Sequence, residues 1–202
     1  MNDPLAESYE YCRQIARHSA TNFYYSFLVL PRPKRRAMCA LYAFLRPTDD
    51  LGDRAQPTAA RAEALARWRD SLQRALAGKI DGQLFPALAD TIACYSIPPE
   101  YLLAVIDGVV MDLEHTSYAT FEDLADYCYK VASAVGLACI HIWGFSSPAA
   151  LEPACRCGLA FQLTNILRDL KEDADRGRVY LPQEDLVRFD YTSEDLRETL
   201  RD

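Results

Sequence analysis

Acidic residues at helical spacing are the features of this sequence best suited to chemistry. Asp49 and Asp53 lie four residues apart in TDDLGD, and Asn165, Asp169 and Asp173 follow one another at the same interval in NILRDLKED. On an α-helix each set occupies one face, and the second column is about 12 Å long. Like charges at this spacing repel, and at a helix C-terminus they also oppose the macrodipole. Both sets therefore call for a bound cation.

Oxygen ligands of this kind favour Mg²⁺, which takes one or two carboxylates and completes its shell with water and substrate phosphate oxygens. The plainer interpretation is that each set is a solvated helix end, because acidic runs usually lie at the surface. The residues that precede the acidic sets on the same helix faces favour the metal site, because they are not typical of a surface.

These preceding residues change from polar to apolar with distance from the carboxylates. Helical steps back from the two sets reach Arg46, Tyr42 and Met38 in the first, and Gln162, Phe161 and Gly158 in the second. Each stripe thus runs from apolar or aromatic side chains, through a guanidinium or an amide, to carboxylates. The pattern predicts an apolar pocket with a metal cluster at its mouth.

A third predicted helix carries small and β-branched residues on one face. They are Tyr127, Val131, Ala134, Val135 and Ala138. Tight helix packing and a pocket wall explain this face equally well, and both interpretations stay open. Gly136 on the same helix costs about 1 kcal/mol relative to alanine, which indicates that a neighbouring helix or a ligand approaches its backbone closely.

The elements that must position these residues are helices. Apolar residues recur at spacings of three and four, prolines stand at segment borders, and no alternating run predicts a convincing sheet. We expect helices near residues 5–17, 34–53, 59–76, 84–95, 99–115, 121–144 and 149–173, with a shorter one opening at 193. Thr120, Ser147 and Ser193 stand where N-caps are expected. Pro47 lies inside the second helix and predicts a kink.

Composition indicates one globular domain over residues 1–202, with 50% hydrophobic and 25% charged residues. The net charge of -7 provides no overall positive field, so nucleic acid is not an expected partner. The most apolar stretch, residues 131–145, falls short of the roughly 20 residues that a bilayer span needs. No secretory signal is recognisable, and the 7 cysteines are scattered through apolar segments. We expect reduced thiols and a cytoplasmic protein, with membrane association as an alternative.

Four segments resemble, in order and at consistent spacing, the successive signatures of the squalene and phytoene synthase family. They are HSATNFYYSFLVLP, RRAMCALYAFLRPTDDLGD, YCYKVASAVG and FQLTNILRDLKEDADRGRVYLP, and the resemblance covers about residues 9–190. It implies an all-α isoprenoid synthase helical bundle with two aspartate-rich motifs on facing helices. Those motifs bind Mg²⁺, with Mn²⁺ as an alternative, and two prenyl diphosphates. The first corresponds to Asp49 and Asp53, and the second to Asn165, Asp169 and Asp173.

The resemblance also implies roles outside the two motifs. Arg46, Arg168 and Arg178 look like diphosphate-binding or motif-supporting residues. The implied reaction-chamber residues are His18, Phe23, Tyr42, Tyr127, Val131, Gly136, Gln162 and Leu163, and Ala134 is expected with Val131 to set the pocket length. Tyr42 and Tyr127 have two roles open to them, sheltering a carbocation or assisting proton removal. A simpler role for His18 is to cap a helix end.

The implied reaction is a head-to-head condensation of two prenyl diphosphates through a cyclopropylcarbinyl diphosphate. Farnesyl diphosphate is the favoured substrate and geranylgeranyl diphosphate the alternative, and the product is of the squalene, presqualene diphosphate or phytoene type. The use of NADPH stays open, because no glycine-rich dinucleotide motif follows a strand. The basic cluster Arg32, Lys34, Arg35 and Arg36 is either a solvated helix start or a contact for anionic lipid.

Family members usually continue for several further helices, so we expect this chain to be C-terminally short. An open apolar flank would then favour a homodimer and make the chain a poor enzyme. The alternative function is a catalytically inactive helical relative that acts as an assembly or lipid-binding factor. A di-iron carboxylate bundle would require paired ExxH motifs, and the sequence has none.

Overall fold

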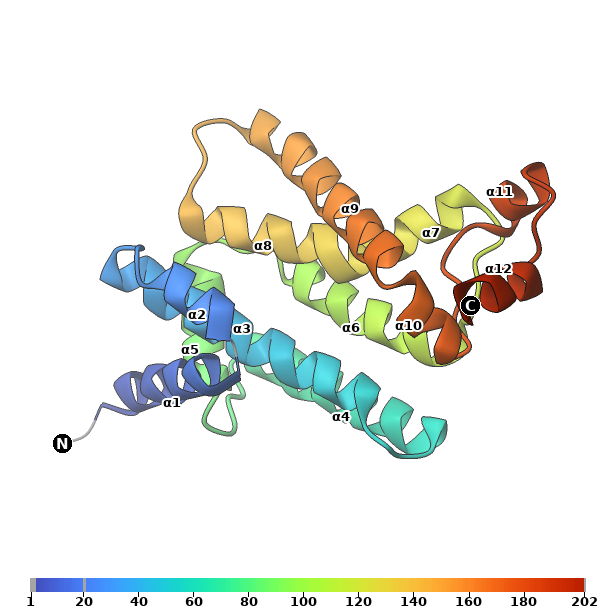
Figure 1. Cartoon of the computed structure of the whole chain (residues 1–202). Helices are drawn as coiled ribbons and strands as arrows, with labels where there is room; N and C mark the ends of the chain where they lie inside the picture. The colour runs from blue at the N-terminus through green and yellow to red at the C-terminus, as the bar shows by residue number, and fades with distance from the viewer. Residues whose placement is uncertain (1–2, 20, 202) are drawn as a thin grey trace.

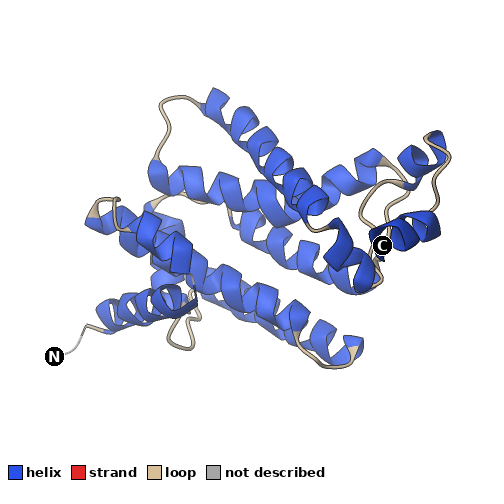
Figure 2. Ribbon diagram, viewed as in Figure 1, coloured by secondary structure: helices blue, strands red, loops and turns tan. Residues whose placement is uncertain are grey.

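The computed structural model describes residues 3–19 and 21–201, and within them every regular element is a helix (Figure 2). The expected all-α fold is confirmed. Among the described residues the only β-type pairing is an isolated bridge between Ser117 and Val179. None of the helices in this part of the chain has both the length and the apolar character that crossing a bilayer requires.

The elements follow in the order α1 (Pro4–Ser19), α2 (Thr21–Phe27), α3 (Arg32–Asp53), α4 (Thr58–Leu76), α5 (Phe85–Cys94), α6 (Pro99–Glu114), α7 (Phe121–Cys128), the π-helical turn η1 (Tyr129–Ser133), α8 (Ala134–Trp143), the 3₁₀ turn η2 (Pro148–Ala150), α9 (Leu151–Arg168), α10 (Leu170–Asp175), α11 (Gln183–Arg188) and α12 (Ser193–Arg201). The expected long helices are all present. Sequence patterning missed the short helices α2 and α11.

Helices α6 and α8 lie in the middle of the bundle (Figure 1). Helix α3 packs on both of them and also contacts α1, α4 and α5, whereas α9 packs on α8 and η1. The two helices that carry the acidic motifs therefore rest on one shared layer. Helices α10 to α12 gather at one end of the molecule, beside the C-terminal end of α6 (Figure 1).

Helix α3 runs without interruption through Pro47, so the proline does not end it. Proline removes one backbone hydrogen bond, and neighbouring contacts support the helix at this point. Thr48 Oγ1 donates to the Phe44 carbonyl at 2.8 Å and accepts from Trp68 Nε1 at 2.8 Å, while the Phe44 and Trp68 rings stack with centroids 5.6 Å apart. These residues join α3 to α4 inside the larger hydrophobic core.

The expected single helix over 121–144 contains the π-helical turn η1. Two glycines allow other helices to approach this turn closely. A Cβ at Gly158 of α9 would lie 2.4 Å from Ser133 Cα, and a Cβ at Gly108 of α6 would lie 2.6 Å from Val131 Cγ1. Ser133 Oγ also donates to the Cys155 carbonyl at 2.7 Å. The turn is thus held between α6 and α9.

Of the two explanations offered for Gly136, close approach by a neighbouring helix is wrong. The nearest atom to a Cβ built there is the Ala154 carbonyl oxygen at 3.9 Å, which is an ordinary van der Waals distance. The close approach occurs instead at Gly108 and Gly158. The structure pairs none of the seven cysteines in a disulfide.

The expected helix over 149–173 is broken at Asp169, whose backbone has φ -100° and ψ 12°. Hydrogen bonds nevertheless cross the break at helical spacing. The Asp169 N–H donates to the Asn165 carbonyl and the Asp173 N–H donates to the Asp169 carbonyl, each at 2.9 Å. The acidic column therefore bends at Asp169 but keeps its order.

The structure confirms two of the three N-caps that the sequence predicts. Thr120 and Asp123 form a capping box at α7, and Ser147 Oγ accepts from the Ala149 N–H at 3.3 Å. At α12 the residue that exchanges such bonds is Thr192, whose Oγ1 accepts from the Asp195 N–H at 3.1 Å, rather than Ser193. Ser193 Oγ instead bonds the Gln183 side chain.

The contact between α9 and η1 predicts opposite effects of alanine at two helical glycines. Gly158→Ala forces a methyl group against the Ser133 backbone and should lower the free energy of unfolding by about 1–3 kcal/mol. Gly136→Ala, the matched control, meets no obstacle and should raise it by up to about 1 kcal/mol because alanine favours a helix. Urea unfolding followed by circular dichroism measures both. Equal effects of the two substitutions would show that α9 does not approach η1 as described.

Candidate functional site

The first acidic motif lies at the C-terminal end of α3. Asp50 forms an ion pair with Arg46 at 2.7 Å, so its charge is compensated within the helix. Asp49 and Asp53 form no ion pair with any described residue. Asp49 is open to solvent on one side, yet burial by the surrounding helices, followed by the charge of Asp53, raises its pKa to about 6. The motif is therefore short of positive charge.

Asp112 on α6 is a third carboxylate at this end, and sequence analysis missed it. Its two oxygens accept hydrogen bonds from Tyr127 Oη at 3.0 Å and Tyr180 Oη at 2.8 Å. Burial raises the pKa of Asp112, although the hydrogen bonds from Tyr180 and Tyr127 oppose the shift. The negative charge of Asp112 also raises the pKa of Asp49, and the charge of Asp53 raises the pKa of Asp112. The only signal in the sequence was one acidic residue inside the apolar run VVMDL.

The second acidic motif spans the break between α9 and α10. Asp169 accepts two hydrogen bonds from Arg168, from Nε at 2.7 Å and from Nη2 at 2.6 Å, which lower its pKa. Asn165 is half-buried, and its amide nitrogen lies 3.4 Å from Gln162 Oε1. Burial raises the pKa of Asp173, and the charge of Asp169 adds to that shift. Within this motif Asp173 is the carboxylate that lacks an ion pair.

Arg178 connects the two motifs electrostatically. Its positive charge lowers the pKa of Asp112 and of Asp173, opposing the effect of burial, and the charge of Asp53 raises the pKa of Arg178 in return. Backbone hydrogen bonds hold the loop that carries Arg178. The Arg178 N–H donates to the Asp173 carbonyl at 2.8 Å and the Val179 N–H donates to the Thr116 carbonyl at 2.9 Å. The structure thus brings residues from α3, α6 and α10 to one end of the bundle.

The donor set at this end fits Mg²⁺ in its chemistry. Asp49, Asp53, Asn165 and Asp173 offer only oxygen to a cation, and three of them carry charge that no described residue neutralises by an ion pair. No three His, Cys, Asp or Glu residues in the described ranges are close enough together to hold a metal by themselves. This suits Mg²⁺, which binds through few protein carboxylates and keeps waters or ligand phosphates in its shell. Mn²⁺ accepts the same donors.

Several implied chamber residues are half-buried and accessible. Tyr42 lies on the α3 face that leads to Asp49, with its ring edge-on to Phe27 at 6.4 Å between centroids. Val131, Gln162, Leu163 and Gly136 are half-buried on η1, α9 and α8. These residues lie on the elements that bear or adjoin the two motifs.

Other implied residues are placed differently. Tyr127 is buried with its hydroxyl bound to Asp112, so it positions that carboxylate. Ala134 is fully buried and faces no open space. Phe23 is 65% exposed on α2. His18 is exposed and its Nδ1 lies 2.7 Å from the Gln14 carbonyl, which is the capping arrangement at the end of α1.

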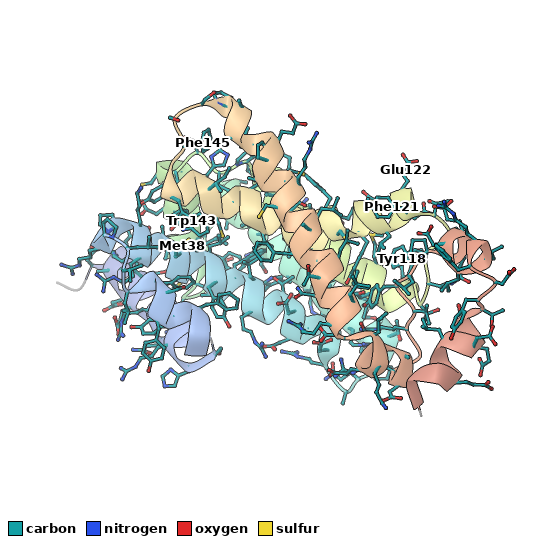
Figure 3. The ribbon with its side chains drawn as sticks, turned by 45° about the horizontal axis from the view of Figure 1, so that its top comes forward. Met38, Tyr118, Phe121, Glu122, Trp143 and Phe145 are labelled. Carbon is teal, nitrogen blue, oxygen red and sulfur yellow. The ribbon has the colours of Figure 1, made fainter. Side chains whose placement is uncertain are left out.

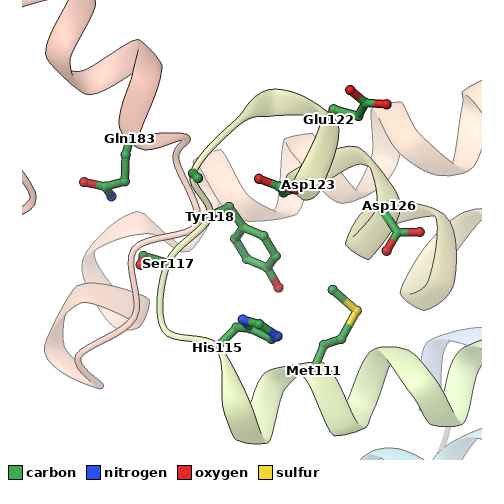
Figure 4. Close-up of a pocket in the computed structure, with 9 residues that line it drawn as sticks. Met111, His115, Ser117, Tyr118, Glu122, Asp123, Asp126 and Gln183 are labelled. Carbon is green, nitrogen blue, oxygen red and sulfur yellow. The ribbon is translucent and has the colours of Figure 1, made fainter.

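Two cavities lie outside the acidic motifs. One, of about 650 Å³, lies beside the tyrosines and is lined by Met111, His115 and acidic side chains of α7 (Figure 4). The buried Tyr118 hydroxyl points into it and has no hydrogen-bond partner among the described residues. The other, of about 420 Å³, lies between α1 and α3 and is lined by arginines. Neither is lined by a residue of the two motifs.

Comparison with known proteins decides the family. The model of the squalene/phytoene synthase family matches residues 16–202. The chain belongs to the squalene/phytoene synthase family. It is 42% identical over 204 residues to a 15-cis-phytoene synthase from Synechococcus elongatus, covering 95% of this chain and 66% of that protein. It is 40% identical over 210 residues to a 15-cis-phytoene synthase from Synechocystis, covering 98% of this chain and 62% of that protein.

Solved structures of the family share the fold. The crystal structure of squalene synthase HpnC from Alicyclobacillus acidocaldarius superimposes with a TM-score of 0.88 at 34% identity, over 96% of this chain and 73% of that one. A dehydrosqualene synthase in complex with ligand superimposes with a TM-score of 0.84 at 33% identity, over 96% of this chain and 69% of that one. The chain spans about two thirds of the length of the cyanobacterial relatives.

The raised pKa of Asp49 predicts that stability depends on pH. Its folded value of about 6 lies above the ordinary value of 3.8, so the folded state holds this proton more tightly than the unfolded state. That contribution to stability is complete below about pH 3.8 and is lost as pH rises through about 6. Asp49→Asn, which carries no charge, should therefore be more stable than the unaltered protein at pH 7.5 and equally stable at pH 4.

Urea unfolding at the two pH values measures this difference. Asp70→Asn on α4, which removes an exposed carboxylate, is the control and should show no such pH dependence. If the stability gain of Asp49→Asn is the same at both pH values, folding does not disfavour the charged form of Asp49.

Proposed function

We propose that this chain is a Mg²⁺-dependent prenyltransferase that joins two prenyl diphosphates head to head through a cyclopropylcarbinyl diphosphate. The observation that carries the proposal is the gathering of Asp53, Asp112 and Asp173 around Arg178, with Asp49 beside Asp53, at one end of a family fold. A diphosphate is an anion with many oxygens, and a metal ion would join it to these carboxylates. The similarity of this chain to phytoene synthases and squalene synthases supports a head-to-head condensation of prenyl diphosphates.

The metal would be held from one side by Asp49 and Asp53, and from the other by Asn165 and Asp173. Asp169 belongs to the same motif, and its oxygens become available once Arg168 turns away. When bound, Mg²⁺ supplies the positive charge that stabilises a departing diphosphate. The carboxylates serve to hold cations and do not attack the substrate.

Three arginines supply the positive side chains. Arg178 stands between the motifs, while Arg46 and Arg168 are each paired with a neighbouring aspartate. A diphosphate competes for these guanidinium groups because bidentate contacts to phosphate oxygens match their geometry. Positive charge fixed where the leaving group develops its negative charge stabilises the transition state.

The apolar residues behind the motifs would form the reaction chamber. Tyr42 presents an aromatic face near the acidic mouth, and such a face attracts a carbocation. On the opposite side, Val131 of η1 and Gln162 and Leu163 of α9 would line the chamber. Its apolar walls would exclude the water that quenches the cation. Tyr127 acts through Asp112 as a positioning residue, since its hydroxyl is bound there.

The substrate and product form the finer part of the proposal. Farnesyl diphosphate is favoured and geranylgeranyl diphosphate is the alternative, with a squalene, presqualene diphosphate or phytoene type of product. Incubation with Mg²⁺ and each diphosphate, followed by mass identification of the extracted lipid, distinguishes them. Repeating the incubation with and without NADPH shows whether the intermediate is reduced.

Replacing one carboxylate in either motif should strongly lower the rate of turnover without unfolding the protein. We expect Asp53→Asn and Asp173→Asn each to lower the rate by at least about 100-fold, a loss typical of removing one electrostatic contact at a reacting centre. Helical content by circular dichroism should be unchanged, because both residues contribute little to the core. Asp70→Asn is the matched control and should keep the full rate. Normal rates in either motif variant would place the metal elsewhere.

A second candidate is an inactive relative that acts as an assembly or lipid-binding factor. The apolar side chains Phe161 and Leu167, exposed by 67% and 60% on α9, favour it because exposed apolar helix surface can bind lipid or a second copy of the chain. The homodimer expected from the sequence would use this face. Failure to bind inorganic diphosphate at any Mg²⁺ or Mn²⁺ concentration would favour this candidate.

Self-association through α9 can be tested separately from activity. We expect Phe161→Ser with Leu167→Ser to lower the dimer fraction in analytical ultracentrifugation. Val187→Ser on α11, where the side chain is 71% exposed, is the control and should leave that fraction unchanged. A dimer fraction that is the same in all three proteins, or zero in the unaltered protein, would exclude this face.

A further inference from the structure

The cavity between α1 and α3 is positively charged in a protein that is negative overall. Arg13, Arg32, Arg35 and Arg36 line it together with one carboxylate, that of Glu10. The whole chain has a formal net charge of -7. The lining of this cavity therefore differs in sign from the chain as a whole.

Most of this positive charge is not neutralised. Arg13 is paired with Glu10 through hydrogen bonds of 2.7 and 2.5 Å, and Arg36 lies over the Tyr9 ring at 4.0 Å from its centre. Arg32 and Arg35 have no acidic partner in the part of the chain that the structure describes. Guanidinium groups arranged around a cavity match the oxygens of a phosphate ester.

Apolar side chains project beside the cavity. Tyr25, Leu28 and Val29, on α2 and the turn after it, are exposed by 66%, 42% and 85%. The turn is closed by hydrogen bonds from the Leu28 N–H to the Tyr25 carbonyl and from the Leu30 N–H to the Phe27 carbonyl, each at 3.1 Å. Exposed apolar residues flanked by basic ones are typical of a segment that lies in a membrane interface.

A second pair of exposed aromatic residues lies at the same end of the molecule. Trp143 and Phe145, at the end of α8 and just after it, are exposed by 48% and 37%. Lys34 Nζ, near the start of α3, donates to the Trp143 carbonyl at 2.5 Å and so joins the two regions. Figure 3 shows Trp143 and Phe145 on the same side of the molecule as Met38 of α3. Tryptophan is enriched where proteins meet the membrane–water interface.

We propose that this end of the molecule is a docking surface for an anionic phospholipid bilayer. Tyr25, Leu28 and Val29 enter the interface, and the arginine-lined cavity receives a lipid phosphate. Charge complementarity selects this occupant, since the surface joins unneutralised arginines to apolar side chains. The acidic motif begins about 21 Å farther along α3, counted from Arg35 to Asp49. Docking in this orientation keeps the acidic end away from a negative membrane.

Vesicle co-sedimentation tests the proposal without any measurement of turnover, so its result is independent of the proposed function. We expect the protein to bind phosphatidylcholine vesicles that contain phosphatidylglycerol at least about tenfold more tightly than vesicles of phosphatidylcholine alone, because each basic residue near an anionic surface contributes to binding. Raising the salt concentration should weaken that binding.

Two variants locate the surface. Arg32→Gln with Arg35→Gln should remove most of the preference for phosphatidylglycerol, and Leu28→Ser with Val29→Ser should weaken binding to the same vesicles. The matched control is Arg67→Gln with Arg156→Gln, which removes the same charge from exposed positions on α4 and α9 and should bind as the unaltered protein does. Circular dichroism confirms that each variant is folded.

Three results would overturn the proposal. The first is equal binding to both kinds of vesicle. The second is loss of binding in the control to the same extent as in the two surface variants. The third is calorimetric binding of inorganic phosphate that depends on Arg32 and Arg35 without any vesicle binding, which would make the cavity a site for a soluble anion.

Discussion

Repulsion among carboxylates at one end of the bundle is the constraint on which the rest of the site depends. Three elements bring acidic residues together there, and protein groups compensate only some of them. Asp50 is paired with Arg46, Asp169 with Arg168, and Asp112 accepts two tyrosine hydroxyls. Asp49, Asp53 and Asp173 form no ion pair with a described residue, and the raised pKa of Asp49 records the cost of charging it. The uncompensated carboxylates leave this end short of positive charge, which the proposed cation would supply.

Close helix packing makes this gathering of carboxylates possible. Gly108 and Gly158 let α6 and α9 approach the turn η1 from two sides, and the turn belongs to the same segment as Tyr127. A π-helical turn contains an extra residue, which shifts the side chains that follow it, and such turns are frequent at functional sites. The position of Asp112 relative to the second motif therefore depends on contacts in the middle of the bundle.

The sequence was sufficient to predict the helical fold and the two acidic motifs, because both repeat at helical spacing along one segment. It was not sufficient for Asp112, since the tyrosines that hold it lie 15 and 68 residues away and no local pattern links them. The break at Asp169 was missed for a similar reason, because the hydrogen bonds across it keep helical spacing. The sequence also does not show which of several helical glycines a neighbouring helix approaches. In this fold they include Gly108 and Gly158 but not Gly136.

We propose that the acidic end binds a diphosphate through a divalent cation. Calorimetric titration with inorganic diphosphate, in the presence and absence of Mg²⁺, tests this claim most directly because it requires neither turnover nor a lipid substrate. We expect binding with Mg²⁺, little binding without it, and loss of the metal-dependent part in Asp53→Asn. Binding of equal strength with and without Mg²⁺, or no binding in its presence, would contradict the account.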